Sequence, residues 1–89
     1  MPEILIPESF MEDYYPKLPG EIRKKLKKTI SLLAENPRHP SLQSKPVTAA
    51  PGIYEARVDL DYRLTYERLP GDVLRLRAIG KHDEILKNP

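Results

Sequence analysis

Hydrophobic and polar residues alternate most strictly between Tyr54 and Glu67, where even-numbered positions are apolar and odd-numbered positions are polar. This period is typical of a strand with one buried face. Because these 14 residues are long for a single strand, we predict a hairpin that turns at residues 59–61. After a turn at Leu69–Asp72 the alternation resumes in a last strand, Val73–Ile79. The apolar face of that strand carries Leu74, Leu76 and Ala78.

Two amphipathic helices are predicted before the hairpin, from apolar residues that recur every three or four positions. The first is expected to end near Tyr15, because Pro16 disfavours helix in the residue before it. The second runs from the Pro19–Gly20 pair to Asn36, which Pro37 follows. The apolar stripes are Phe10, Tyr14 and Leu18 in the first helix and Ile22, Leu26, Ile30 and Leu33 in the second.

The remaining segments complete an α+β fold. Glu3–Ile6 is expected to be a short strand, and Leu42–Thr48 an edge strand because Pro46 is tolerated only at an edge or a bulge. The tail 81–89 is expected to contain one helical turn capped by Asp83. The predicted order is β-α-α-β-β-β-β, with the two N-terminal helices packed on one face of an antiparallel sheet, in a single domain spanning residues 1–89.

Composition excludes several classes of function. The 89 residues include no cysteine, which rules out a disulfide scaffold, a thiolate zinc site and a cysteine nucleophile. No apolar run reaches the ~18 residues of a membrane span, so we expect a soluble, cytoplasmic protein. Neither a glycine-rich phosphate loop nor a zinc-ligand spacing occurs, and we expect no cofactor and no metal. Net charge is only +2, so any binding of nucleic acid must depend on where the charge lies.

The alternation also predicts which residues lie opposite one another. To keep the apolar residues on one face, both turns need loops of odd length, and a three-residue loop at 59–61 sets Arg57 opposite Arg63. At the second turn a three- or five-residue loop pairs Tyr66 with Leu74. It sets Arg63 opposite Arg77, or opposite a neighbouring position if a bulge intervenes.

The resulting row of arginines, on the face away from the helices, has two interpretations. Guanidinium groups bind phosphate oxygens in pairs, so the row could cradle a phosphate. The other interpretation is an ordinary solvated face. In that case its charge is balanced by Glu55, Asp59, Asp61 and Glu67.

Basic residues gather in the first half of the longer predicted helix, at the end where the helix dipole favours acidic ones. They form either an ordinary solvated face or a surface for RNA, DNA or an acidic partner. They are Arg23, Lys24, Lys25, Lys27 and Lys28.

His82 follows the last strand and could act as a general acid or base near neutral pH. Asp83 beside it could hold the imidazole in one tautomer, or could simply cap a helical turn above a surface histidine. His39, between two prolines, is expected to be a loop residue.

The strings GIYEARVDLDYRLTYE and LRLRAIGKHDEIL resemble the C-terminal half of the RelE/ParE superfamily of toxins from bacterial toxin–antitoxin pairs. LPGEIRKKLKKTISLLAENPRHPSL is similar to the superfamily's second helix and the connection after it. The most specific parts are the D-Y-R-L-x-Y strand and the I-G-K-H-D end, and the YafQ-like branch is nearest.

The resemblance implies the toxin of a toxin–antitoxin pair, with a cognate antitoxin, mRNA and the ribosome as partners. Many such toxins are metal-independent endoribonucleases that cleave translated mRNA. The RNA 2′-hydroxyl attacks the adjacent phosphate, basic side chains stabilise the phosphorane, and an acid protonates the leaving 5′-oxygen. ParE-like members share the fold but inhibit DNA gyrase and cleave nothing. A non-enzymatic toxin of that type, or a degenerate interaction module, is therefore the alternative.

Matching positions carry roles over from the superfamily. Arg63 matches a phosphate-binding arginine, and His82 matches the catalytic histidine of YafQ-like members, oriented here by Asp83 or Asp61. Asp61 matches an active-site aspartate of those members, and Arg57 stands where they carry a histidine. The further residues expected to contact RNA are Arg75, Arg77, Lys81, Lys45, Arg23, Lys24, Lys27 and Lys28.

The chain also departs from the superfamily pattern. Ile85 and Leu86 occupy the region where several RelE-like nucleases use a tyrosine, so Glu55 or Asp61 would have to supply the second acid or base.

Overall fold

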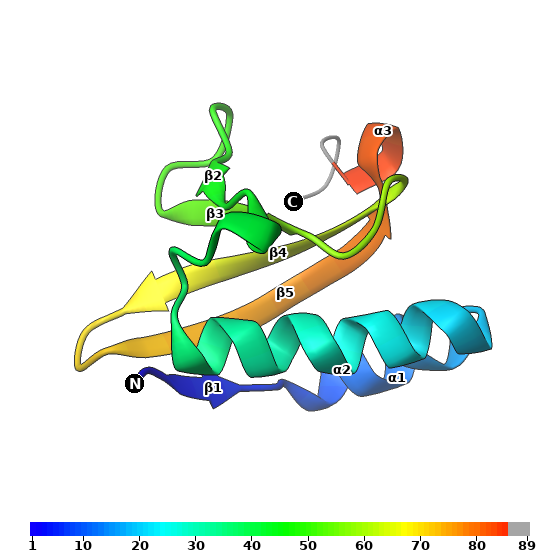
Figure 1. Cartoon of the computed structure of the whole chain (residues 1–89), viewed down its shortest axis with the longest axis horizontal. Helices are drawn as coiled ribbons and strands as arrows, with labels where there is room; N and C mark the ends of the chain where they lie inside the picture. Colours follow the sequence, from blue (N-terminus) through cyan, green and yellow to red (C-terminus); the bar gives the residue numbers. More distant parts are fainter. Residues whose placement is uncertain (86–89) are drawn as a thin grey trace.

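Five strands form one mixed sheet in the order β1-β5-β4-β3-β2 (Figure 1). The structure, a computed structural model, describes residues 1–85 of the chain. Within residues 1–85, three α-helices and two 3₁₀ turns connect or follow the strands. In chain order the elements are β1 Glu3–Leu5, α1 Glu8–Asp13, η1 Tyr15–Lys17, α2 Gly20–Glu35, η2 Pro40–Leu42, β2 Lys45–Pro46, β3 Ile53–Arg57, β4 Tyr62–Leu69, β5 Val73–Lys81 and α3 His82–Ile85.

The helices α1 and α2 lie along one face of the sheet (Figure 1), and the core lies between them and β3, β4 and β5. β3 and β4 contribute their even-numbered residues to this core, as the alternation predicts, and β5 contributes Leu74, Leu76 and Ile79. Leu42 of η2 extends the same core. The most deeply buried large side chains are Phe10, Leu26, Leu33, Leu42, Leu64, Tyr66 and Leu76.

The predicted α+β class is confirmed, with three differences in its elements. β1 pairs with β5 in parallel, so the sheet is mixed rather than antiparallel throughout. The first helix is shorter than expected, because Pro16 takes part in a separate 3₁₀ turn. The predicted strand Leu42–Thr48 shrinks to Lys45–Pro46, which pairs with β3 at the edge of the sheet, where a proline costs no ladder hydrogen bond.

The first hairpin has the predicted register, with Arg57 directly opposite Arg63. The second does not. Leu69 pairs with Val73 and Tyr66 with Leu76 rather than Leu74.

A bulge between Thr65 and Tyr66 then shifts the pairing, so that Arg63 lies opposite Gly80 instead of Arg77. The bulge adds one residue to β5 and inverts its parity. Ile79 therefore faces the helices beside Leu64, and Ala78 faces the other side beside Thr65.

The face away from α1 and α2 is buried along its centre. Glu55, Thr65 and Ala78 are at most 3% exposed there. At the end of this face α3 folds over the sheet, and the side chain of Ile85 lies 3.8 Å from where a Cβ on Gly80 would be. The predicted helical turn begins at His82, so Asp83 lies inside its first turn rather than capping it. The rest of the predicted tail, residues 86–89, lies outside the described residues.

Candidate functional site

A hollow of about 310 Å³ lies where the β3–β4 turn meets the end of β5. The main-chain N–H of His82 donates to the main-chain oxygen of Asp61 at 2.8 Å, which ties α3 to this turn. The hollow thus unites residues from the two most specific strings of the sequence. Its lining consists of Leu60, Asp61, Arg63, Lys81, His82 and Asp83.

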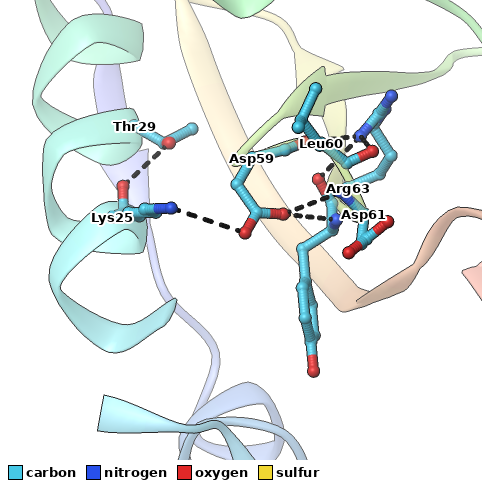
Figure 2. Close-up of polar contacts among 7 residues, drawn as sticks. Lys25, Thr29, Asp59, Leu60, Asp61 and Arg63 are labelled. Atoms are coloured by element: carbon cyan, nitrogen blue, oxygen red, sulfur yellow. Dashed lines mark hydrogen bonds and ion pairs between the residues drawn. The ribbon is translucent and has the colours of Figure 1, made fainter. Parts of the chain in front are cut away.

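Arg63 serves both the hollow and the turn beside it. Its Nη1 donates to the main-chain oxygens of Asp59 at 2.8 Å, Tyr62 at 3.0 Å and Leu60 at 3.3 Å (Figure 2). Its Nε and Nη2 donate to none of the described residues. One edge of the guanidinium therefore holds the turn closed, while its remaining N–H donors are left for an anion.

Asp59 organises the same turn from its other side. Its Oδ1 accepts hydrogen bonds from the main-chain N–H groups of Tyr62 at 2.8 Å and Asp61 at 2.9 Å. Its Oδ2 lies 3.6 Å from Nζ of Lys25, which reaches across from α2 (Figure 2). Burial raises the pKa of Asp59, but the hydrogen bonds from Tyr62 and Asp61 and the charge of Lys25 outweigh it, so the pKa lies below its usual value.

His82 is half-buried, and its Nδ1 is sealed from solvent without a hydrogen-bond partner among the described residues. The expectation that a carboxylate of Asp83 or Asp61 orients the imidazole is therefore wrong. Asp61 holds His82 through its main-chain oxygen instead.

Arg57 adjoins the hollow through its pairing with Arg63, and its side chain makes no hydrogen bond or ion pair with a described residue.

A family model for the ParE toxin of type II toxin–antitoxin systems, parDE, matches residues 10–86. The chain belongs to this family. Among curated proteins none matches it.

Solved structures of related toxins share the fold of this ParE-family chain. A chain of the RelB–RelE antitoxin–toxin complex from Methanococcus jannaschii is 24% identical, with a TM-score of 0.72 over 96% of this chain and 99% of that one. YafQ from E. coli strain BL21(DE3) is 25% identical, with a TM-score of 0.70 over 96% of this chain and 98% of YafQ. A chain of the archaeal RelE–RelB complex from Pyrococcus horikoshii OT3 is 17% identical, with a TM-score of 0.71 over 90% and 93%. The predicted RelE/ParE membership is therefore confirmed.

Three of the expected RNA-binding residues of this ParE-family chain lie beside carboxylates and do not line the hollow. Arg75 is hydrogen-bonded to Glu67, its partner across the β4–β5 ladder, and Nη1 of Arg77 lies 3.6 Å from the same carboxylate. Nζ of Lys45 lies 3.5 Å from the buried Glu55. Glu55 is thus paired with Lys45 and does not line the hollow, which leaves Asp61, of the two carboxylates considered for acid–base chemistry, beside Asp83 in its lining.

The basic half of α2 divides into anchored and solvated residues. Arg23 donates to the main-chain oxygens of Tyr15 at 3.2 Å and Pro16 at 2.7 Å, so it fastens η1 to α2. Lys25 is the partner of Asp59. The exposed residues that form no hydrogen bond or ion pair with a described residue are Lys24, Lys27 and Lys28.

The link between Lys25 and Asp59 escaped the sequence reasoning, since their separation of 34 positions leaves no local pattern. The only available signal was Asp-x-Asp in a turn, where aspartates commonly bond to main-chain N–H groups.

Within residues 1–85 no group of three or more His, Cys, Asp or Glu side chains could hold a metal ion. In the same range no helix has the length and apolar character needed to span a membrane.

Proposed function

We propose that this ParE-family toxin is a metal-independent endoribonuclease that cleaves translated mRNA in the cytoplasm, as one domain spanning residues 1–89. The observation that carries the proposal is the shared hollow of Arg63, His82 and Asp61. A phosphate-binding guanidinium, an imidazole and a carboxylate around one space are the groups that an RNA-cleaving transesterification needs. Arg57, whose side chain forms no hydrogen bond or ion pair with a described residue, lies opposite Arg63 and adds a second guanidinium.

In the proposed reaction the carboxylate of Asp61 takes the proton of the RNA 2′-hydroxyl, whose oxygen forms a new bond to the adjacent phosphorus. The bond from phosphorus to the 5′-oxygen breaks, and the imidazolium of His82 protonates that oxygen. The products are a 2′,3′-cyclic phosphate and a 5′-hydroxyl end. Arg63 and Arg57 stabilise the additional negative charge of the phosphorane, where preorganised charged donors contribute most.

Partners follow from the same proposal. Lys81 and the exposed lysines of α2, Lys24, Lys27 and Lys28, would contact RNA of the message or the ribosome. A cognate antitoxin is expected because similar structures are toxin–antitoxin complexes, namely RelB–RelE and DinJ–YafQ. We expect its acidic segment to cover Arg57 and Arg63 or to displace the segment that carries His82.

The test is induced expression of variants, followed by mapping of message ends. His82→Ala should lower cleavage by about 10²–10⁴-fold, the usual contribution of a positioned acid or base. Asp61→Asn should lower it similarly. Glu84→Ala, an exposed change on the same helix, should cleave like the wild type. New ends should carry a 5′-hydroxyl that polynucleotide kinase labels without prior phosphatase treatment, and chelation by EDTA should leave cleavage unchanged.

The second candidate is a non-nucleolytic gyrase inhibitor, which the match to the ParE family model favours. Growth arrest with intact messages, equal in wild type and His82→Ala, would support it, and a supercoiling assay with purified gyrase would then decide. A wild-type chain that arrests nothing would instead indicate a degenerate interaction module.

A further inference from the structure

A second hollow, lined by basic residues, lies at the other end of the sheet from the hollow that Asp61, Arg63 and His82 line. It measures about 320 Å³ and is bounded by the segment 37–46 and by Tyr54 and Arg68 of β3 and β4. We call it the Arg68 hollow. Arg68 and Arg63, which line the two hollows, are five residues apart on β4, which at about 3.3 Å per residue separates the hollows by about 17 Å.

The guanidinium of Arg68 lies over an aromatic ring, and its N–H donors bond to no described residue. Its guanidinium carbon lies 4.3 Å from the ring centre of Tyr54, and that ring stacks on Tyr66 with 5.8 Å between centres. Arg68 is exposed and makes no hydrogen bond or ion pair with a described residue. The aromatic stack therefore holds the cation in place while its N–H groups stay available to a ligand.

The opposite wall adds three further donors. Arg38 is exposed, and its side chain contacts no described acid. Nδ1 of His39 accepts the N–H of Ser41 at 3.1 Å, so the neutral ring carries its proton on Nε2. Ser44 is one of the residues that line the hollow, and its Oγ is buried without a hydrogen-bond partner among the described residues. An unpartnered buried hydroxyl costs free energy unless a ligand satisfies it.

Charge selects the class of ligand. Among the described residues that line the Arg68 hollow there is no Asp or Glu, and its third cation, Lys45, is already paired with Glu55. An adjoining hollow of about 330 Å³ shares Arg38 and Arg68 and adds Asp72, whose carboxylate lies 4.0 Å from the N-terminal amino group. The Arg68 hollow is thus suited to an anion.

From this arrangement we propose that the Arg68 hollow binds a nucleotide of single-stranded RNA, with the phosphate on Arg38 and Ser44 and the base stacked on Arg68. Bases of unpaired RNA stack on aromatic rings and on guanidinium planes, and the Tyr54–Arg68 stack provides such a plane. The carboxylate of an acidic peptide would use the positive charges but leave that plane without a partner. The choice of RNA rests on the proposed function, whereas the site itself does not depend on cleavage.

The experiment measures fluorescence anisotropy of a labelled, fully 2′-O-methylated oligouridine, which lacks the attacking hydroxyl. Binding is therefore read apart from any cleavage, and a failure here is distinct from a failure of the proposed nuclease. Arg38→Gln should weaken binding by about tenfold, the usual loss for a charged hydrogen bond, and Arg68→Gln should weaken it by a similar factor because it removes the stacking plane. Arg38→Gln should also lower the slope of log K against log salt by about 0.7, because it removes a contact to phosphate.

Two further variants keep the test sharp. Ser44→Ala should weaken RNA binding without lowering stability, since its hydroxyl has no partner to lose. Lys17→Gln removes the same charge from an exposed site outside both hollows, and it should change affinity by less than about twofold. Equal effects of Lys17→Gln and the two arginine changes would overturn the proposal. The proposal would also be overturned if the two arginine variants lost binding to a polyglutamate peptide but bound the oligouridine like the wild type, which would indicate an acidic protein partner.

Discussion

Arg63 donates from Nη1 to the main-chain oxygen of Asp59 at 2.8 Å, although it lies directly opposite Arg57 on the neighbouring strand. The hydrogen bonds of one arginine thus support a turn, whereas the other arginine contributes only its charge. Like charges directly opposite in a sheet destabilise it by up to about 1 kcal/mol. The pair is tolerated at a cost in stability, as expected where two guanidinium groups serve one ligand.

Arg63→Ala and Arg57→Ala should therefore differ in their effects on folding. Arg63→Ala should lower the free energy of unfolding by about 1 kcal/mol, because the carbonyls of the turn lose a charged donor. Arg57→Ala should leave that free energy unchanged or raise it by up to about 1 kcal/mol, because it removes only repulsion. Urea unfolding of both variants measures this. Equal losses would contradict the assignment of Arg63 to the turn.

The lowered pKa of Asp59 predicts a dependence of stability on pH. A carboxyl group with a lower pKa in the folded state stabilises the fold above its unfolded pKa, near the usual value of 3.8. That contribution is lost as the pH falls through the folded pKa. Asp59→Asn keeps an oxygen for the main-chain N–H groups but has no charge to lose, so it should lose less stability on acidification from about pH 7 to about pH 3 than the wild type does.

Lys25→Gln is the matched control for this pH dependence, because it removes the charge that faces Asp59 and keeps the hydrogen bonds of the turn. It should reduce the pH dependence only in part. Thermal unfolding at both pH values gives the comparison. If the stability of Asp59→Asn fell with pH as steeply as that of the wild type, Asp59 would not be the source of the pH dependence.

Tyr66 carries a hydroxyl at the centre of the core that lacks a described partner. Its side chain is 0% exposed, so solvent does not reach that oxygen. Tyr66→Phe should leave the free energy of unfolding unchanged or raise it by about 1 kcal/mol, because it removes an unsatisfied polar group. Tyr62→Phe, at a half-buried position of the same strand, is the control. A loss above about 1 kcal/mol would mean that a buried water bonds to the hydroxyl.

Gly71 occupies the β4–β5 turn with φ of +83°, beside Asp72 with φ of +58°. Gly71→Ala should cost about 1 kcal/mol, since a side chain is strained in the left-handed region even where space is open. Gly20→Ala, at the first residue of α2 and also in open space, should be neutral or slightly stabilising. Denaturation midpoints of the two variants should therefore move apart, and a shared shift would refute the argument.

Binding of the proposed antitoxin should weaken as salt increases from about 50 to about 500 mM, because screening acts over this range on charges that solvent reaches, such as the half-buried Arg57. Calorimetric titration of the toxin with its antitoxin measures the effect. Affinity that does not change with salt would indicate an apolar interface. The exposed apolar residues around α1, Leu5, Ile6 and Met11, would then be the surface to test.

Much of the fold could be read from local patterns. The spacing of Ile22, Leu26 and Leu33 predicted α2 nearly to its ends, because an amphipathic stripe buries only when the helix forms. The alternation on both sides of residues 59–61 predicted that Arg57 faces Arg63, because a shift of one residue would expose every apolar side chain of a strand.

Other features depended on the tertiary structure. Ala78 and Ile79 are both apolar, so the sequence could not tell which of them faces the helices. The bulge in β5 decides this, and together with the register of the β4–β5 turn it places Gly80 rather than Arg77 opposite Arg63. The parallel pairing of β1 with β5 is likewise a contact between opposite ends of the chain.

By itself the sequence determined the elements, the register of the first hairpin and the residue types that the site would use. Only the tertiary structure decided which of them meet. It joined His82 to the turn through Asp61, tied Lys25 to Asp59, and left Arg75 and Arg77 beside Glu67. The physical reason is that a sequence pattern reports only on residues that are close together in the chain. Periodicity reports the burial of a face within one element, whereas an ion pair or a hollow depends on how separate elements pack, which neighbouring residues in the sequence do not specify.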